Sequence, residues 1–217
     1  MCNLYSLTRP ADAMRQTFRV DRDLTGNLPS MPAIFPDQLA PVVRSDRDGS
    51  RELIRMRWGF PPPPNTGSQA VTNVRNTKSP FWRAWLKPEF RCLVPLTSFC
   101  EYTDERPKVP HWFGVDESRP LAAFAGIWRP WTGTRGTKAQ PVEGEQLLYS
   151  FLTTEPNSVV KPIHAKAMPV ILTTPDEWDA WLNAPVEEAL QLQRPLANDA
   201  LQVVATGARS DEAPQIA

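Results

Sequence analysis

The sequence lacks a long apolar run and offers few metal-binding residues: it has two histidines, three cysteines and no net charge. A membrane-spanning helix needs about 20 consecutive apolar residues, so we expect no membrane span. No basic segment followed by an apolar segment opens the chain, and we therefore expect a cytoplasmic protein. Cys2, Cys92 and Cys100 are expected to remain thiols in that reducing compartment. Their spacing includes no paired C-x-x-C ligands, which argues against zinc.

The charges are distributed unevenly along this neutral chain. Residues 1–110 hold 16 Lys and Arg against 11 Asp and Glu, whereas residues 111–217 hold 8 against 13. A basic half permits a local phosphate-binding surface, although the same imbalance also arises from ordinary surface scatter.

Proline, in contrast, is abundant, with 24 among 217 residues. Because proline lacks a backbone N–H, it excludes long helices, and we expect short elements joined by stiff loops. The length suits one domain, predicted over residues 1–217 with residues 207–217 flexible. Residues 21–41 are predicted to be irregular, and residues 133–144 to form a flexible loop.

Strands are predicted to outnumber helices. One helix is expected from about Pro10, with Ala11, Met14 and Phe18 on one face. A second is expected from a capping box at residues 174–177 to about residue 182. The predicted strands are residues 53–58, 92–94, 112–115, 122–128, 147–153, 168–172 and 201–205. Because helices do not alternate with these strands, we predict an α+β fold around a mostly antiparallel sheet flanked by short helices.

Cys2 is the first residue with notable chemistry. Methionine aminopeptidases remove Met1 when the second residue is small, and removal would leave an amine and a thiol on adjacent carbons. Such an aminothiol condenses with an aldehyde to a Schiff base, which the thiol closes to a five-membered thiazolidine. The unperturbed pKa is about 8 for the amine and about 8.5 for the thiol, so both groups are reactive near neutral pH. Position alone favours the alternative that Cys2 is a small apolar residue within a sheet.

Other residues have chemical and structural alternatives of the same kind. His164 precedes an apolar strand and could exchange protons, or could be a hydrogen-bonded structural residue. Glu101 follows a strand among aromatic residues, where burial would raise its pKa. Asn73 and Arg75 share a face of an extended segment and could orient a reacting group and hold a phosphate. Trp58 and its neighbouring aromatic residues could stack on unpaired bases, or belong to the core.

Seven segments occur in an order that resembles the SOS-response-associated peptidase family, also called abasic-site processing proteins. They are Met1-Cys2-Asn3-Leu4-Tyr5, Arg57-Trp58-Gly59-Phe60, Asn73-Val74-Arg75, Arg91-Cys92-Leu93-Val94-Pro95 with Phe99-Cys100-Glu101, Phe124-Ala125-Gly126-Ile127-Trp128, Thr153-Thr154-Glu155-Pro156-Asn157, and Ile163-His164 before Met168-Pro169-Val170-Ile171-Leu172. The resemblance runs from residue 2 to about residue 206, and implies one α+β domain around an open, β-barrel-like sheet.

The resemblance also implies a function, a site and a partner. The family binds single-stranded DNA and forms a thiazolidine with the ring-opened aldehyde of an abasic site. Cys2 would be the linking residue, and Asn73 would position it. Glu101 would transfer protons during Schiff-base formation, and His164 would assist opening of the sugar and reversal of the link. No cofactor or metal is expected, and the protein is expected to act as a monomer.

The same resemblance suggests DNA-binding residues. Arg75 would hold a flanking phosphate, and Lys166 occupies a place where the family often has a DNA-contacting arginine. We also expect Arg57 and Trp58 to contact DNA. Departures from the family's pattern, such as Asn76-Thr77 without an intervening Glu and Cys100 in place of the usual Tyr, fall outside the residues assigned to the chemistry.

Three alternatives to a stable crosslink remain open. A Schiff base would permit β-elimination, which would make the protein an abasic-site lyase. The family name suggests a cysteine peptidase with Cys2 as nucleophile and His164 as base, active on other proteins or only on itself. A non-covalent module would keep the same residues and bind single-stranded DNA, but would form no covalent bond with abasic sites.

Overall fold

Strands dominate this computed structural model, which describes residues 2–212. Met1 and residues 213–217 lie outside the described residues, and so does that part of the flexibility predicted for residues 207–217. A nine-stranded sheet contains β12 (Met168–Pro169), β11 (Gln140–Thr154), β10 (Ala122–Thr137), β7 (Arg91–Leu96), β4 (Leu39–Ser45), β5 (Arg51–Trp58) and β2 (Arg22–Asp23), with β13 (Ile171–Leu172) and β6 (Asn73–Val74) paired to its sides. A five-stranded sheet runs in the order β14 (Gln202–Thr206), β9 (Pro110–Gly114), β8 (Ser98–Tyr102), β1 (Tyr5–Leu7) and β3 (Met31–Ile34).

Five strands of the larger sheet close into a barrel. The strands β10, β7, β4, β5 and β11 pair in that order, and β11 also pairs with β10. The closing contact is the parallel pairing of β11 with β5, where Tyr149 lies opposite Trp58. The α+β class is confirmed, but the expectation of an open barrel is wrong, because this parallel contact joins the two edges. Closure removes the exposed edges that an open sheet would leave.

Aromatic side chains fill the barrel. Tyr5 contacts Trp58 edge-on at 5.2 Å between ring centroids, and Phe124 stacks on Phe151 at 4.3 Å. The hydroxyl groups of Tyr5 and Tyr149 are 2.6 Å apart and share a hydrogen bond, which satisfies both polar groups inside the core. Strand β1 therefore contributes a central core residue only three positions after Cys2.

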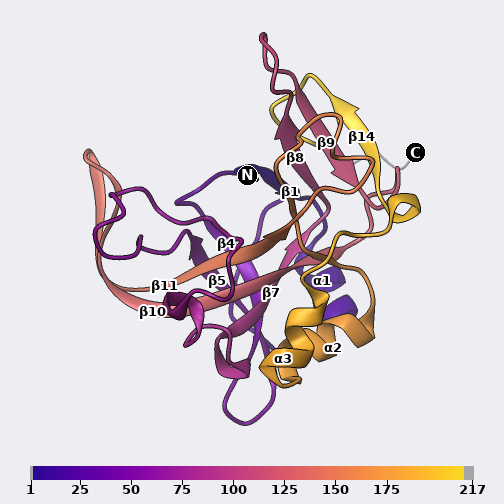
Figure 1. Cartoon of the computed structure of the whole chain (residues 1–217). Helices are drawn as coiled ribbons and strands as arrows, with labels where there is room; N and C mark the ends of the chain where they lie inside the picture. Colours follow the sequence, from indigo (N-terminus) through magenta and orange to yellow (C-terminus); the bar gives the residue numbers. More distant parts are fainter. Residues whose placement is uncertain (1, 213–217) are drawn as a thin grey trace.

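The helices lie together beside the barrel (Figure 1). They are α1 (Ala11–Phe18), α2 (Pro175–Asn183) and α3 (Val186–Ala189), and short 3-10 turns cover Pro80–Trp82, Pro88–Phe90, Leu190–Leu192 and Asn198–Ala200. The predicted capping box is confirmed, since the hydroxyl of Thr174 accepts from the backbone N–H of Glu177. Helix α2 is fixed to the barrel by Trp181, whose indole N–H donates to the carbonyls of Cys92 and Gly126, each at 3.0 Å.

Two predicted irregular segments prove to be regular. Residues 21–41 contain β2, β3 and the start of β4. Residues 133–144, predicted to be a loop, form a two-stranded ribbon in which β10 and β11 stay paired as far as Thr137 and Gln140. The Gly and Thr composition resembles a loop, but tertiary contacts hold the ribbon. The N–H of Gly136 donates to Asp37 at 2.9 Å, and Arg135 donates to the carbonyl of Gly59 at 2.7 Å.

A buried polar network ties the C-terminal segment to the smaller sheet. Asp211 pairs with Arg119 at 2.8 Å and accepts a hydrogen bond from the hydroxyl of Ser98 at 2.5 Å. The hydroxyl of Ser98 is also 2.8 Å from that of Ser6 in β1. All four side chains are buried, so the two ends of the described chain are held against the same strand, β8.

Candidate active site

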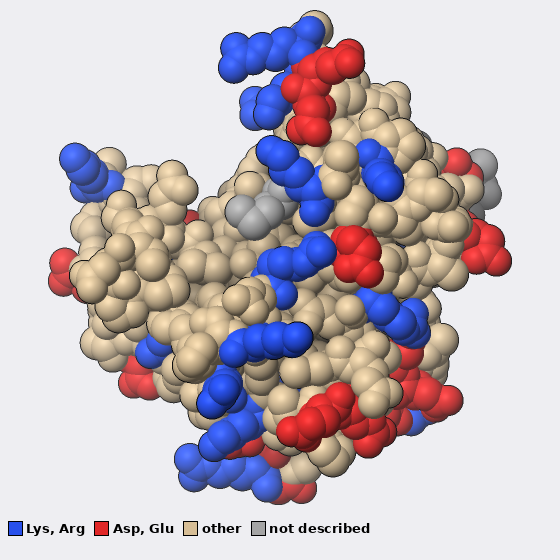
Figure 2. All heavy atoms as spheres, in the orientation of Figure 1, with Lys and Arg blue, Asp and Glu red and all other residues tan. Residues whose placement is uncertain are grey.

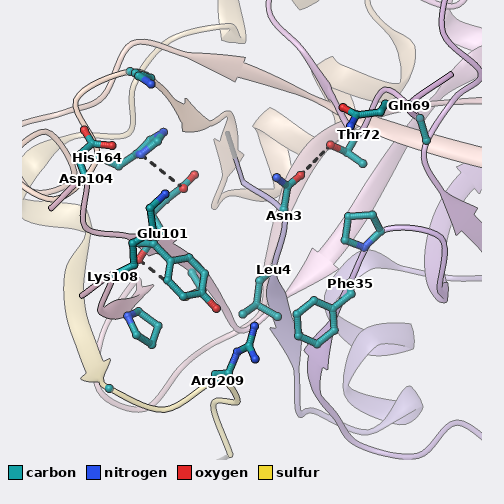
Figure 3. A pocket seen from close by; sticks show the side chains of 17 residues that line it. Asn3, Leu4, Phe35, Gln69, Thr72, Glu101, Asp104, Lys108, His164 and Arg209 are labelled. Carbon is teal, nitrogen blue, oxygen red and sulfur yellow. Dashed lines mark hydrogen bonds and ion pairs between the residues drawn. The ribbon is translucent and has the colours of Figure 1, made fainter. Parts of the chain in front are cut away.

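A cleft of about 1230 Å³ lies against the N-terminal segment and the end of β8. Figure 3 shows Asn3 and Leu4 in the middle of its lining, with Glu101 and His164 to one side and Thr72 to the other. Charged, amide and hydroxyl groups thus face the same space as apolar side chains. Such mixed clefts are where binding and catalytic sites usually lie.

The pairing of β1 with β8 places Cys2 next to this cleft, which is lined by the following residues Asn3 and Leu4. Tyr5 lies opposite Phe99, and the N–H of Cys100 donates to the carbonyl of Leu4 at 2.9 Å. Continuing this antiparallel register leads the N-terminal residues past Glu101. Cys2 itself is 1% exposed, and its thiol lies 3.4 Å from the carbonyl of Leu4, to which it donates.

The thiol of Cys2 is held in its protonated form. Burial raises its pKa well above the ordinary value, and the nearby carboxylate of Glu101 raises it further. A neutral thiol in this position reacts only when it comes within reach of a strong electrophile, such as an iminium carbon formed at the adjacent amine, or when a base removes its proton.

Asn73 fixes the backbone at Cys2. Strand β6 runs parallel to β11, with Asn73 opposite Phe151, and this places the amide inside the protein. The amide N–H group donates to the carbonyl of Cys2 at 2.8 Å and is also 2.8 Å from the hydroxyl of Thr72. The amide oxygen of Asn73 is buried and accepts no hydrogen bond from residues 2–212. One acceptor therefore remains available beside the N-terminal residues.

Glu101 and His164 form the second part of the site. The imidazole Nδ1 of His164 is 3.8 Å from a carboxylate oxygen of Glu101, and both side chains are buried (Figure 3). Burial raises the pKa of Glu101 to about 7 and lowers the pKa of His164. Near neutral pH, Glu101 is therefore divided between acid and carboxylate, while His164 is mostly a neutral base. Two groups with such altered pKa values in one cleft are suited to moving protons.

The predicted phosphate-binding residues lie at the surface near this site. Arg75 is 47% exposed and pairs with Glu155 at 3.5 Å. Its backbone carbonyl accepts from the side chain of Gln193 at 2.9 Å, which fixes the segment that follows Asn73. Lys166 is exposed and lines the cleft. Figure 2 shows Lys and Arg side chains gathered in and below the central hollow of this face.

Two predicted DNA contacts are not placed at the cleft. Trp58 is 0% exposed inside the barrel, and its indole N–H donates to the carbonyl of Thr72 at 3.1 Å. The prediction that Trp58 stacks on a base is therefore wrong, because closure of the barrel encloses its ring. The guanidinium of Arg57 bonds the carbonyl of Asp37 and the side chain of Gln146, and it does not line the cleft.

Sequence reasoning did not find several lining residues. Thr72 donates from its hydroxyl to the side-chain oxygen of Asn3 at 3.0 Å, which fixes the residue that follows Cys2. Lys108 and Arg209 add cations to the cleft, and Figure 3 shows Arg209 beside Leu4. Arg209 follows the last strand, and no local pattern around it indicates a site. Its position depends on the anchoring of the C-terminal segment.

No group of three or more His, Cys, Asp or Glu side chains within residues 2–212 is arranged to hold a metal ion. Over the same part of the chain, no helix is both long enough and apolar enough to cross a membrane.

The sequence profile of the SOS response associated peptidase family matches residues 1–209. The chain belongs to this family. A curated relative, the abasic site processing protein HMCES of Gallus gallus, is 29% identical over 197 residues. That match covers 76% of this chain and 56% of the relative, so the chain spans about half the length of the relative.

Solved structures support the fold of this family member. A protein from Bordetella bronchiseptica is 21% identical with a TM-score of 0.73, and the match covers 95% of this chain and 99% of that one. A protein from Bacteroides thetaiotaomicron is 22% identical with a TM-score of 0.71, and the match covers 94% of this chain and 90% of that one. At these identities the likeness establishes the architecture alone.

Proposed function

We propose that this protein binds single-stranded DNA and forms a covalent thiazolidine with abasic sites through Cys2 after Met1 is removed. The observation that carries the proposal is that Asn73 holds the carbonyl of Cys2, while Glu101 and His164 lie 3.8 Å apart in the cleft that Asn3 and Leu4 also line. A cysteine that acts through its thiol alone could lie anywhere in the chain. The proposed reaction also needs the α-amine of Cys2, which only an N-terminal cysteine has. The membership of the family and the name of the avian relative support the same substrate.

The chemistry proceeds by condensation without any redox step. An abasic sugar exposes an aldehyde when its ring opens, and the Cys2 amine adds to the carbonyl carbon to give a carbinolamine. Loss of water forms the Schiff base. The Cys2 sulfur then bonds to the same carbon, and the thiol proton is transferred to the nitrogen. The product has the mass of protein plus DNA minus one water.

The two buried titratable groups can divide the proton transfers. Protonated Glu101 donates to the departing hydroxyl, which is the step that needs an acid. Neutral His164 accepts a proton from the sugar hydroxyl as the ring opens. The free oxygen of Asn73 accepts a hydrogen bond from the Cys2 amine and orients its lone pair towards the aldehyde.

A cysteine peptidase is less consistent with this site. Peptide hydrolysis by cysteine needs a thiolate, which a neighbouring histidine usually supplies. Burial and the carboxylate of Glu101 both raise the pKa of the Cys2 thiol, the opposite of that requirement. The Cys2 thiol donates to the carbonyl of Leu4 at 3.4 Å, and the imidazole Nδ1 of His164 lies 3.8 Å from a carboxylate oxygen of Glu101.

The first experiment is an intact-mass measurement of the protein alone and after mixing with a single-stranded oligonucleotide that contains one abasic site. We expect loss of Met1 and an adduct that lacks one water. Cys2→Ala removes the stable adduct, whereas Cys100→Ala, which removes the thiol of a residue that lines the cleft, retains it. Retention of Met1, or an adduct that survives in Cys2→Ala after denaturation, contradicts the proposal.

The lyase alternative is tested with the same reagents. Cys2→Ala with Met1 removed keeps the amine but cannot close the thiazolidine. If the Schiff base persists long enough for β-elimination, this variant cleaves the abasic strand more than the unmodified protein does. An oligonucleotide that stays intact with Cys2→Ala eliminates the lyase activity.

A further inference from the structure

Asn3 projects an amide into the cleft one residue after Cys2. Its side chain is exposed and lines the cleft, whereas Cys2 and Leu4 on either side of it are buried. The side chain of Asn73 donates at 2.8 Å to the carbonyl of Cys2, which is part of the peptide bond to Asn3. The backbone that carries the amide of Asn3 is therefore fixed directly beside the reacting residue.

A chain of hydrogen bonds orients this amide. An amide N–H of Asn73 donates to the hydroxyl oxygen of Thr72 at 2.8 Å, and the hydroxyl of Thr72 donates to the side-chain oxygen of Asn3 at 3.0 Å. A hydroxyl has only one proton to donate, and here Asn3 accepts it. If the amide of Asn3 were flipped, two N–H groups would point at the Thr72 oxygen and the hydroxyl proton would lose its acceptor. The side-chain oxygen of Asn3 therefore faces Thr72.

The side-chain nitrogen of Asn3 is left free to donate. The side chain forms no other hydrogen bond with residues 2–212. Figure 3 shows its oxygen on the side of Thr72 and its nitrogen on the side of Glu101 and His164. Two N–H groups thus enter the cleft on the side of the pair that is suited to moving protons.

Opening of an abasic sugar needs a donor of this kind. As His164 takes the proton of the hydroxyl on C1′, the C1′ carbonyl forms, the bond from C1′ to the ring oxygen O4′ breaks, and negative charge develops on O4′. Water then protonates O4′ to a hydroxyl and His164 returns its proton to solvent, so the step is an isomerisation without any other reagent. An amide N–H directed at O4′ stabilises the charge while it develops.

We propose that Asn3 is a further catalytic residue, which donates a hydrogen bond from its side-chain nitrogen to O4′ and so accelerates opening of the abasic sugar. This inference rests on the proposed function, because only an abasic site brings a closed sugar to Cys2. It predicts a chemical selectivity. Asn3 acts on an aldehyde that must be released from a ring, and takes no part in the capture of an aldehyde that is already free.

The test compares two single-stranded oligonucleotides in single-turnover crosslinking. One contains an abasic site, and the other contains an acyclic aldehyde at the same position, which has no ring and no O4′. The variant is Asn3→Ala. Gln69→Ala is the matched control, because Gln69 also presents an exposed amide in the lining of the cleft but lies outside the chain of hydrogen bonds that ends at Asn3.

Asn3→Ala should slow crosslinking to the abasic oligonucleotide and leave the rate with the acyclic aldehyde unchanged. Loss of one donor to a developing oxyanion costs about 100-fold or more in an enclosed site, and the exposure of Asn3 reduces the expected loss to about 10-fold. Thr72→Val removes the hydroxyl that orients the amide and should change the ratio of the two rates in the same direction. Gln69→Ala should leave this ratio unchanged.

Equal slowing with both oligonucleotides, which a merely structural role of Asn3 predicts, overturns the inference, and so does an unchanged rate with both. The unsubstituted protein distinguishes this inference from the proposed function. No adduct with the abasic oligonucleotide refutes the thiazolidine function. An adduct whose rate relative to the acyclic aldehyde is the same in Asn3→Ala refutes only the role of Asn3.

Discussion

Replacing Glu101 with glutamine tests the buried acid in two independent ways. Burial raises the pKa of Glu101 from 4.5 to about 7, so the folded protein favours its protonated form. A group whose folded pKa is raised stabilises the protein fully below its unfolded pKa and loses that contribution as pH rises through the folded value. Glutamine does not titrate, and the variant keeps its stability where the native protein loses it.

The magnitude follows from the shift. About 2.5 pH units at about 1.36 kcal/mol each give about 3 kcal/mol. Between pH 4.5 and pH 8, the free energy of unfolding of Glu101→Gln should therefore gain about 3 kcal/mol relative to the unsubstituted protein. Urea unfolding at several pH values measures this gap. Glu105→Gln, an exposed change on the adjoining loop, should show almost no pH-dependent gap.

The kinetic effect of Glu101→Gln has the opposite sign. Glutamine cannot donate a proton to the departing hydroxyl, so crosslinking at pH 6.5 should slow by about 100-fold or more, as is typical when a general acid is removed. The decline in rate above pH 7, which deprotonation of Glu101 causes, should also disappear. A stability gap that does not vary with pH refutes the argument from burial. An unchanged rate refutes the role of Glu101 in proton transfer.

Three other substitutions give separate tests. Asn73→Ala removes the hydrogen bond to the carbonyl of Cys2, which is worth about 1–2 kcal/mol. In single-turnover assays crosslinking should slow by about 10-fold, with little change in DNA affinity. An equal loss of affinity would contradict a positioning role. Glu155→Gln removes an exposed anion that competes with phosphate for Arg75. Affinity for unmodified single-stranded DNA should rise by up to about 5-fold at low salt and should not rise at high salt. A loss of affinity would show that the ion pair is needed for binding. Asp211→Asn leaves a buried arginine unpaired and should destabilise the protein by about 3 kcal/mol or more in urea unfolding, whereas Glu212→Gln, an exposed neighbour, should change little.

Local patterns in the sequence predicted local structure well. The capping box at Thr174 depends on residues within one turn, and its hydrogen bonds form as expected. The apolar face of α1 likewise buries Met14 and Phe18. The strand predicted at residues 53–58 forms within β5, yet the complete burial of Trp58 depends on the parallel contact with β11, which no local pattern encodes.

The residues of the candidate site were predicted mainly from the order of the family-like segments along the chain. The hydrogen bond from Asn73 to Cys2 spans 71 positions, and the pair of Glu101 and His164 joins a strand to a distant loop. Neither pairing follows from periodicity. The ribbon at residues 133–144 shows the same limit, since its composition favours a loop and the contact of Gly136 with Asp37 decides otherwise.

The position of β1 has a mechanical consequence. The strand lies between β3 and β8 and is hydrogen-bonded on both sides, with Tyr5 opposite Ile34 and Phe99. If DNA is linked at Cys2, a pull on the DNA acts along this strand. The ladders on both sides then carry the load together in shear and do not open one bond at a time. A motor that draws the strand forward must therefore extract β1 from the core, together with Tyr5, before the rest of the protein yields.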